Sequence, residues 1–216
     1  MTILLVAATE SELKPVLEGF FRGSDAEGFT LGTLRVKCLV SGVGMVSTAF
    51  ELAKELSAHR YDFAINIGIA GSFNRNLAIG QVLQITDDFF ADFGAEDGPH
   101  FLSMHDLGLA KNHYAPILPN ISSPALEGLE KVRAITVNKV HGNELSIAAT
   151  TDRLHPDLES MEGAAFFYAC QQFALPSIQI RSISNYVERR NRDQWDIPLA
   201  IDQLHQFLHT FLTEIA

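Results

Sequence analysis

FAINIGIAG, residues 63–71, is the stretch that decides the fold. Its apolar residues follow one another without polar alternation, which is typical of a strand that is covered on both faces. The same continuous apolarity recurs at ILLVAA (3–8), VKCLVSG (36–42), VLQIT (82–86), ITVN (135–138) and SIQIRSIS (177–184). The sequence therefore predicts an α/β fold in which a central sheet lies between layers of helix.

Apolar spacing at three and four residues predicts two amphipathic helices. In 43–57, the residues on one face are Val43, Val46, Ala49, Phe50, Ala53 and Leu56. In 197–212, they are Ile197, Ile201, Leu204, Phe207, Leu208, Phe211 and Leu212. Asp196, which precedes Ile197-Pro198, is expected to cap the second helix. A third helix is expected at about 161–173, after the cluster ESMEGAAF.

Length and composition favour one globular domain over residues 1–216. The formal net charge of -10 would repel the phosphate backbone of a nucleic acid. Cys38 and Cys170 lie in apolar surroundings, which favours two buried free thiols in a reducing cytosol. MTILLVAATESE at the N-terminus suits neither a signal peptide nor a membrane span. We therefore expect a cytoplasmic protein that binds neither nucleic acid nor membrane.

Residues 87–118, which include DDFFADFGAEDGPHF, show no clear periodicity. A connection of this length is uncommon unless it is functional. We expect a contact between subunits, or a lid that closes over this subunit's pocket or a neighbour's.

Motifs for other chemistries are incomplete. Ser41-Gly42-Val43-Gly44 follows a strand, but Ser47 replaces the third glycine of a dinucleotide fingerprint, so a tight turn is favoured. Asp202, His205 and His209 share a helix face, yet the apolar stripe of that helix directs the histidines toward solvent rather than toward a metal. Phosphate-loop and Gly-x-Ser-x-Gly patterns are absent. We expect neither a cofactor nor a metal.

Two pairs of carboxylates are stronger candidates for chemistry: Glu10 with Glu12, and Glu159 with Glu162. For any single glutamate the alternative is a solvated first-turn residue that is favoured by the helix dipole.

Ala70 and Gly71 end the strand at 63–71, where small residues let a flat ligand approach the backbone. A plain turn is the alternative there.

Five segments occur in the order, and near the spacing, of the purine nucleoside phosphorylase and nucleosidase superfamily: AATESEL (7–13), SGVGMVSTA (41–49), NIGIAGS (66–72), ESMEGAA (159–165) and RSISNYV (181–187). The chain resembles this superfamily over nearly its whole length. Within it, SISNYVERRNRDQWDI (182–197) is similar to the futalosine hydrolases. The resemblance implies a three-layer α/β/α fold with a mixed, twisted central sheet, a small-molecule purine nucleoside substrate and a homo-oligomer.

The resemblance also implies roles for individual residues. Glu12 matches the glutamate that activates water, and Glu162 matches the one that accepts hydrogen bonds from the ribose hydroxyls. Met161 would pack against the sugar, and Arg181 would orient Glu162. Residues matched to the base are Ala70, Gly71, Ser184 and Asn185. Ile69 stands where relatives often carry serine or threonine, so any hydroxyl contact there is lost.

Asn185 stands where relatives that act on adenine nucleosides commonly carry aspartate. An amide offers both a donor and an acceptor, so it suits O6 and the N7 proton of departing hypoxanthine. Adenine would place its 6-amino donor against the NH₂ donor of the amide, and this mismatched pair would cost about 1–3 kcal/mol of binding free energy. A strand-ending role alone is the alternative. Because an amide delivers no proton, the N7 proton would come from water or from Ser184.

Futalosine carries a carboxybenzoyl group at its 5′ end. One of Arg189, Arg190 and Arg192 is expected to pair with that carboxylate, with Trp195 as an apolar wall, and a solvated basic loop is the alternative. After the first strand, one group of phosphorylases carries a segment with a phosphate-binding arginine, whereas this chain has the acidic segment ATESELKP (8–15). Negative charge beside the nucleophile disfavours phosphate and suits water, which favours hydrolysis over phosphorolysis. Three alternatives stay open: a methylthioadenosine or adenosylhomocysteine nucleosidase, a purine nucleoside phosphorylase, and a nucleoside-binding protein without turnover.

Overall fold

The computed structural model describes residues 1–20 and 28–216 of the 216-residue chain. Its strands are β1 (Thr2–Ala7), β2 (Gly28–Leu31), β3 (Leu34–Val40), β4 (Phe63–Ser72), β5 (Val82–Phe90), β6 (Gly94–Asp97), β7 (His100–Ser103), β8 (His113–Tyr114), β9 (Glu130–Thr136), β10 (Leu158–Ser160) and β11 (Ser177–Tyr186). Its α-helices are α1 (Glu10–Phe20), α2 (Met45–Ala58), α3 (Pro124–Glu127), α4 (Glu144–Leu154), α5 (Gly163–Gln172) and α6 (Ile197–Ile215).

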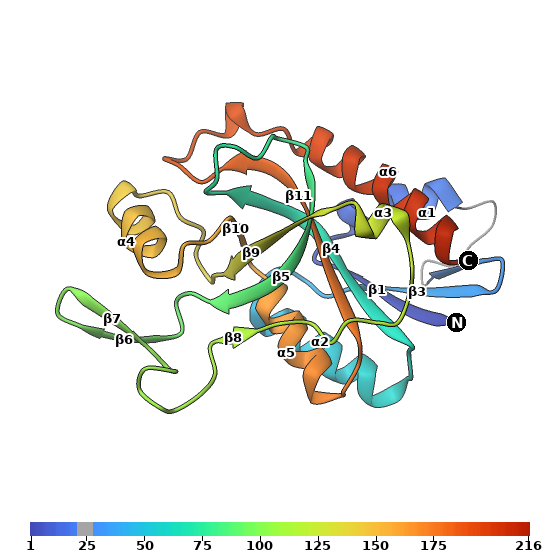
Figure 1. The fold of residues 1–216 in the computed structure, drawn as a ribbon, viewed down its shortest axis with the longest axis horizontal. Helices are drawn as coiled ribbons and strands as arrows, with labels where there is room; N and C mark the ends of the chain where they lie inside the picture. The colour runs from blue at the N-terminus through green and yellow to red at the C-terminus, as the bar shows by residue number, and fades with distance from the viewer. Residues whose placement is uncertain (21–27) are drawn as a thin grey trace.

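The large sheet is mixed, and its order is β10-β9-β5-β11-β4-β1-β3-β2, with β8 paired to β5. Strand β4 runs parallel to β1 and β11, whereas β5 runs antiparallel to β11. Because β10 pairs with both β9 and β4, the strands β4, β11, β5, β9 and β10 form a closed ring. Helices α1, α3 and α6 cover one side of the sheet, and α2 and α5 cover the other (Figure 1). The predicted three-layer α/β/α fold is confirmed.

Strand β4 contains the quoted stretch, and its residues alternate between two cores. Phe63, Ile65 and Ile67 join the core beneath α1 and α6. Ala64 and Ala70 join the core beneath α2 and α5. Both faces of the strand are therefore buried, which is why the quoted stretch is apolar apart from Asn66, whose side chain is hydrogen-bonded to Arg181.

The other predicted strands are present, but one begins earlier than its apolar run. Strand β9 spans Glu130–Thr136, whereas the prediction covered 135–138. Its first half alternates between exposed and buried residues, so only its last residues form a continuous apolar run. Cys38 and Cys170 are buried and free, as predicted, and burial raises the pKa of each thiol to about 12. Among the described helices, none is long and apolar enough to span a membrane.

Helix α6 confirms its predicted apolar face and its cap, because the Asp196 side chain accepts a hydrogen bond from the backbone N–H of Leu199 at 3.0 Å. Helix α2 does not match its prediction. Its buried residues are Thr48, Leu52 and Leu56, while Val46 is 78% and Phe50 66% exposed. Thr48 can face the core because its hydroxyl donates to the carbonyl of Gly44 at 3.0 Å, which satisfies its polar group.

The segment 87–118 is more ordered than its sequence suggested. Strand β5 continues to Phe90, and β6 and β7 form a hairpin that extends away from the large sheet (Figure 1). In the described chain, no residue of 87–118 lines the pocket described below, so a lid over this subunit's own pocket is not supported. A contact between subunits stays a prediction.

Candidate active site

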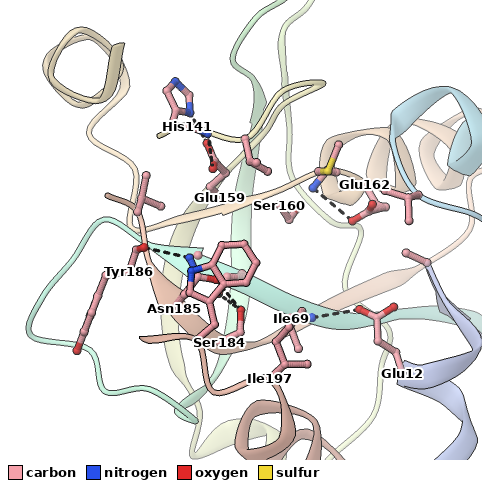
Figure 2. A pocket seen from close by; sticks show the side chains of 18 of the residues that line it. Glu12, Ile69, His141, Glu159, Ser160, Glu162, Ser184, Asn185, Tyr186 and Ile197 are labelled. Atoms are coloured by element: carbon pink, nitrogen blue, oxygen red, sulfur yellow. Dashed lines mark hydrogen bonds and ion pairs between the residues drawn. The ribbon is translucent and has the colours of Figure 1, made fainter. Parts of the chain in front are cut away.

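A cavity of about 360 Å³ opens where β1, β4, β10 and β11 end. All five of the segments quoted above contribute to its wall, through Glu12, Val43, Gly71, Glu162 and Asn185. In Figure 2, Ser184 and Asn185 lie toward one end of this pocket, and Glu12 and Glu162 lie toward the other. The structure thus brings together carboxylates and an amide that are far apart in the sequence.

Glu12 is held by the first turn of its own helix. Its Oε2 accepts from the backbone N–H of Thr9 at 2.9 Å and from the Thr9 hydroxyl at 2.8 Å. This is the reach of a capping-box glutamate back to the residue before the helix. Its Oε1 accepts from the backbone N–H of Ile69 at 3.3 Å, and the residue is only 7% exposed. Glu12 is therefore both a capping residue and a buried carboxylate in the pocket wall.

Gly68 is required by the close approach of two charged groups. A Cβ atom at this position would lie 2.9 Å from Glu12 Oε1 and 3.3 Å from Arg181 Nη1. The absence of a side chain at Gly68 thus lets the guanidinium approach the carboxylate from β11.

Arg181 is fully buried, and its contacts differ from the expected pairing with Glu162. Its Nη2 donates to Asn66 Oδ1, and its Nη1 donates to the carbonyl of Ile180 at 3.2 Å. Within the described part of the chain, no ion pair joins Arg181 to Glu162. Burial lowers the pKa of Arg181, while the charges of Glu162 and Glu12 oppose that change. Arg181 therefore acts on these carboxylates through space.

Glu162 lies at the start of α5 and is fixed by two backbone donors. Its carboxylate accepts from the N–H of Gly44 at 3.0 Å and from the N–H of Met161 at 3.3 Å. Burial raises its pKa, and the charge of Arg181 is the strongest opposing influence. Gly44 has φ of 92°, a conformation that glycine adopts readily, so the turn at 41–44 brings a donor to this carboxylate.

Asn185 follows an irregularity in β11, where the pairing with β4 shifts between Ile183 and Asn185. Its Oδ1 accepts from the Ser184 hydroxyl at 2.8 Å, and its Nδ2 donates to the carbonyl of Tyr186 at 3.0 Å. A carboxamide has two donor hydrogens and two acceptor lone pairs. Each side of the amide therefore retains one hydrogen-bonding position for a ligand.

Of the four residues predicted to bind a 5′ substituent, two line the cavity. Arg190 and Trp195 are in the wall, and the Arg190 guanidinium lies 4.9 Å from the centre of the Trp195 ring. Arg189 and Arg192 are exposed and do not line it, although Arg192 lies 6.0 Å from the same ring. Met161, Ala70 and Ser184, which the resemblance matched to the sugar and the base, line the cavity, and their roles stay predictions.

Sequence analysis named Glu159 as a candidate but missed its partner His141, beside the base end of the pocket. The ring Nδ1 of His141 contacts Glu159 Oε2, and its Nε2 lies 2.9 Å from the hydroxyl of Thr150. His141 lies in the loop after β9, and ligands often bind where loops leave the carboxyl ends of strands, but no local pattern marks its contact with Glu159.

The prediction that His205 faces solvent was wrong. The residue is half-buried, and its Nε2 donates to the backbone carbonyl of Glu12 at 2.9 Å. The apolar stripe of α6 predicted the buried face but not the reach of a long polar side chain at its edge. Across residues 1–20 and 28–216, no group of three or more His, Cys, Asp or Glu residues is placed to hold a metal ion.

Comparisons with known proteins identify the family of this chain. The family model described as "Phosphorylase superfamily" matches residues 2–213. A futalosine hydrolase of Streptomyces coelicolor is 30% identical, and the match covers 77% of this chain and 74% of that protein. The chain belongs to the futalosine hydrolase family of the phosphorylase superfamily. The resemblance inferred from sequence segments is thereby confirmed.

Two further proteins resemble the chain over nearly its whole length. The futalosine hydrolase of Thermus thermophilus is 27% identical over 98% of this chain and 95% of that protein. A structure of the S-adenosylhomocysteine nucleosidase from Streptococcus pyogenes in complex with 5-methylthiotubericidin has a TM-score of 0.82 and 22% identity, and covers 100% of this chain and 98% of the other. This likeness shows the shared fold.

Proposed function

We propose that this protein hydrolyses the N-glycosidic bond of futalosine and releases hypoxanthine. The observation that carries the proposal is the Asn185 amide, which keeps one donor and one acceptor for a ligand in the same pocket as Glu12 and Glu162. Membership of the futalosine hydrolase family supports the choice of substrate.

The charged end of the pocket suits attack by water. Glu12 has a carboxylate whose orientation is fixed by Thr9 and Ile69, and it would take a proton from a water molecule attacking C1′. Glu162 would accept hydrogen bonds from the two ribose hydroxyls, which orients the sugar as it gains positive charge. Met161 lines the same wall and would pack against the ribose. The nearby anions stabilise an oxocarbenium-like sugar and would repel a phosphate nucleophile.

The amide end of the pocket suits departure of hypoxanthine. Because the Asn185 amide delivers no proton and the Ser184 hydroxyl donates to that amide, water would protonate N7 as the base departs. The free N–H of Asn185 would then donate to O6, and its carbonyl oxygen would accept from the N7–H of the base. Ser184 contacts this amide directly, so its hydroxyl is placed to orient the carbonyl oxygen. Adenine would meet the amide donor with its own amino group, which leaves a polar pair unsatisfied.

The test of the proposed reaction is chromatographic. Futalosine, inosine and methylthioadenosine would each be incubated with the protein, with and without phosphate, and the released base identified. We expect hypoxanthine from futalosine at a rate that phosphate does not change. Release of adenine from methylthioadenosine in preference, or a strict requirement for phosphate, would reject the proposal in favour of a nucleosidase for that substrate or a phosphorylase.

We further propose that Arg190, stacked on Trp195, pairs with the carboxylate of the 5′ group. Arginine and carboxylate form two parallel hydrogen bonds, and only this arginine of the three lines the cavity. Arg190→Met should lower kcat/KM for futalosine more than for inosine, which lacks the 5′ group. Arg189→Met, at an exposed neighbour, is the matched control and should change neither value. An equal fall for both substrates in Arg190→Met would reject this role.

We propose, too, that two copies of the chain associate through the exposed face of α2. Val43, Val46 and Phe50 are 56%, 78% and 66% exposed, which is unusual for a contiguous apolar face. Beside them lies a hollow of about 630 Å³, also lined by Phe93 and Tyr168. Val43 lines the active-site pocket as well, so a second copy on this face would help to close it.

Sedimentation of the wild type and of Phe50→Asp tests this association. We expect a dimer for the wild type and a monomer for the variant. Leu145→Asp is the matched control, because Leu145 is 82% exposed on α4, away from α2 in Figure 1. A wild-type monomer, or a Phe50→Asp dimer, would contradict the proposal.

We also propose a cytoplasmic location, because both cysteines are free thiols, and cell fractionation would test it.

A further inference from the structure

Three residues on three neighbouring strands form a row across the floor of the pocket. Glu159 of β10 pairs with Gly71 of β4, and Asn185 of β11 pairs with Gly71 from the other side. Neighbouring strands lie about 4.8 Å apart, so the backbone of Gly71 separates Glu159 from Asn185 by roughly two such spacings. All three residues line the pocket.

Gly71 keeps the middle of this row open. A Cβ atom there would lie 3.2 Å from Asn185 Nδ2 and 3.0 Å from Val187 Cγ2. Residues directly paired across strands point to the same face of a sheet. A flat heterocycle over Gly71 would therefore have the amide of Asn185 at one edge and the carboxylate of Glu159 at another.

The carboxylate of Glu159 is held in one orientation. Its Oε1 accepts from the backbone N–H of His141 at 2.9 Å, and its Oε2 contacts the Nδ1 of the same residue. The other ring nitrogen of His141 lies 2.9 Å from the Thr150 hydroxyl, which fixes the imidazole in turn. Figure 2 shows His141 beside Glu159 on the pocket wall. Each carboxylate oxygen has two lone pairs, so each retains one for a ligand.

The chemistry of purines gives this acceptor a use. A 6-oxopurine carries a hydrogen on N1, whereas adenine has a lone pair there. A carboxylate accepts hydrogen bonds and donates none, so it binds the first ring and repels the second. If Asn185 contacts O6 and N7, as the proposed function requires, N1 is the next polar atom around the same edge.

We propose that Glu159 is a specificity-determining residue that accepts the N1–H of hypoxanthine, and that His141 and Thr150 are positioning residues that hold its carboxylate. This inference rests on the proposed function for the orientation of the base. It adds a second recognition point to Asn185: the amide reads O6 and N7, and the carboxylate reads N1. A ring with an amino group at C6 and no N1 hydrogen would fail at both points.

The test uses free bases, so that it does not depend on turnover. Calorimetry would measure the binding of hypoxanthine, 1-methylhypoxanthine and adenine to the wild-type protein. A hydrogen bond to a charged acceptor is lost on methylation, so we expect 1-methylhypoxanthine to bind roughly tenfold to a hundredfold more weakly than hypoxanthine. Binding of the methylated base within about twofold of hypoxanthine, or no binding of hypoxanthine, would overturn the inference.

A variant separates recognition by Glu159 from simple crowding near N1. In Glu159→Ala the ratio of the two affinities should fall toward one, because the acceptor is gone and space replaces it. A ratio that persists in the variant would overturn the assignment. Thr150→Ala, which loosens only the imidazole, should lower the ratio partly. Glu18→Gln makes a comparable change of charge at an exposed site on α1 and should leave the ratio as in the wild type.

The two proposals can fail separately. Hypoxanthine release from futalosine together with equal binding of both 6-oxopurines would uphold the reaction and remove the role of Glu159. Discrimination against 1-methylhypoxanthine that Glu159→Ala abolishes, without futalosine hydrolysis, would uphold Glu159 as a reader of N1–H and remove the proposed substrate.

Discussion

Glu12 and Asn185 line the same pocket, but the chain positions them by different means. Both partners of Glu12 Oε2 come from Thr9, three residues earlier, through the capping box of α1. Asn185 owes its place to the pairing of β11 with β4, and it faces Glu159 only because β10 pairs with β4 from the other side. Glu12 is thus oriented chiefly by a local motif, whereas Asn185 is positioned by strand register.

The two ends also differ electrostatically. Near Glu12, charges of both signs gather around buried Arg181, including Glu162 and the fully buried Asp88. At the base end, the neutral Asn185 amide and the proposed Glu159 acceptor work by the direction of their hydrogen-bonding groups. We therefore expect substitutions at the charged end to change rate or stability, and substitutions at the base end to change which base is released.

The largest effect is expected for Glu12→Gln. Loss of a general base lowers rate by about a hundredfold to ten-thousandfold, so kcat should fall by this range while KM changes little. Glu10→Gln is the matched control, because Glu10 is exposed two residues earlier on the same helix. Steady-state hydrolysis of futalosine measures both. Nearly full activity in Glu12→Gln would remove the water-activating role.

Asp88→Asn tests the electrostatics of the charged end through stability. Burial raises the pKa of Asp88 from its usual 3.8 to about 6, despite hydrogen bonds from Gln179 and Thr136. The pKa of Asp88 is higher in the folded state than in the unfolded state. The contribution of this carboxyl group to the free energy of unfolding is therefore fully present below about pH 4 and is lost as pH rises through about 6. The shift corresponds to about 3 kcal/mol at most.

The free energy of unfolding, measured at pH 4 and pH 7, provides the readout. Wild-type protein should lose stability over this interval relative to Asp88→Asn. The amide can be accommodated because Gln179 Oε1 has no hydrogen-bond partner and could accept from it after rotation of the Gln179 amide. Parallel pH profiles for the two proteins would show that the carboxyl does not titrate as described.

Asn185→Asp tests the base end. A carboxylate accepts from both the N7 proton and a 6-amino group, so the variant should favour the 6-amino analogue of futalosine. We expect the ratio of kcat/KM values to shift by roughly tenfold to a hundredfold toward the amino substrate. An equal loss on both substrates would indicate that Asn185 only ends the strand.

The smallest effect is expected for His205→Ala, because His205 touches the backbone of Glu12 rather than its carboxylate. Loss of one hydrogen bond, about 0.5–1.5 kcal/mol, would lower kcat by roughly twofold to tenfold and leave KM unchanged. His205→Gln, whose amide can reach the same carbonyl, should restore most of kcat. A change confined to thermal stability, with kcat intact, would make this contact purely structural.

The sequence predicted the elements that depend on local pattern. The buried strands and the capping of α6 by Asp196 follow from residues within a few positions of one another, whereas the role of Glu12 was implied by the resemblance of AATESEL to a known superfamily. What it missed depends on tertiary contact. The exposed stripe of α2 was mistaken for its buried one because Thr48 satisfies its hydroxyl inside the core. His141 has no local signal for its contact with Glu159, 18 residues later.

The most direct test of the central claim, that a neutral amide selects a 6-oxopurine while Glu12 activates water, is a competition in one vessel. Equal amounts of futalosine and its 6-amino analogue would be hydrolysed by the wild-type protein, and the released bases quantified early in the reaction. The ratio of products then equals the ratio of kcat/KM values. We predict hypoxanthine in at least about tenfold excess over adenine. Adenine in equal or greater amount would contradict the account.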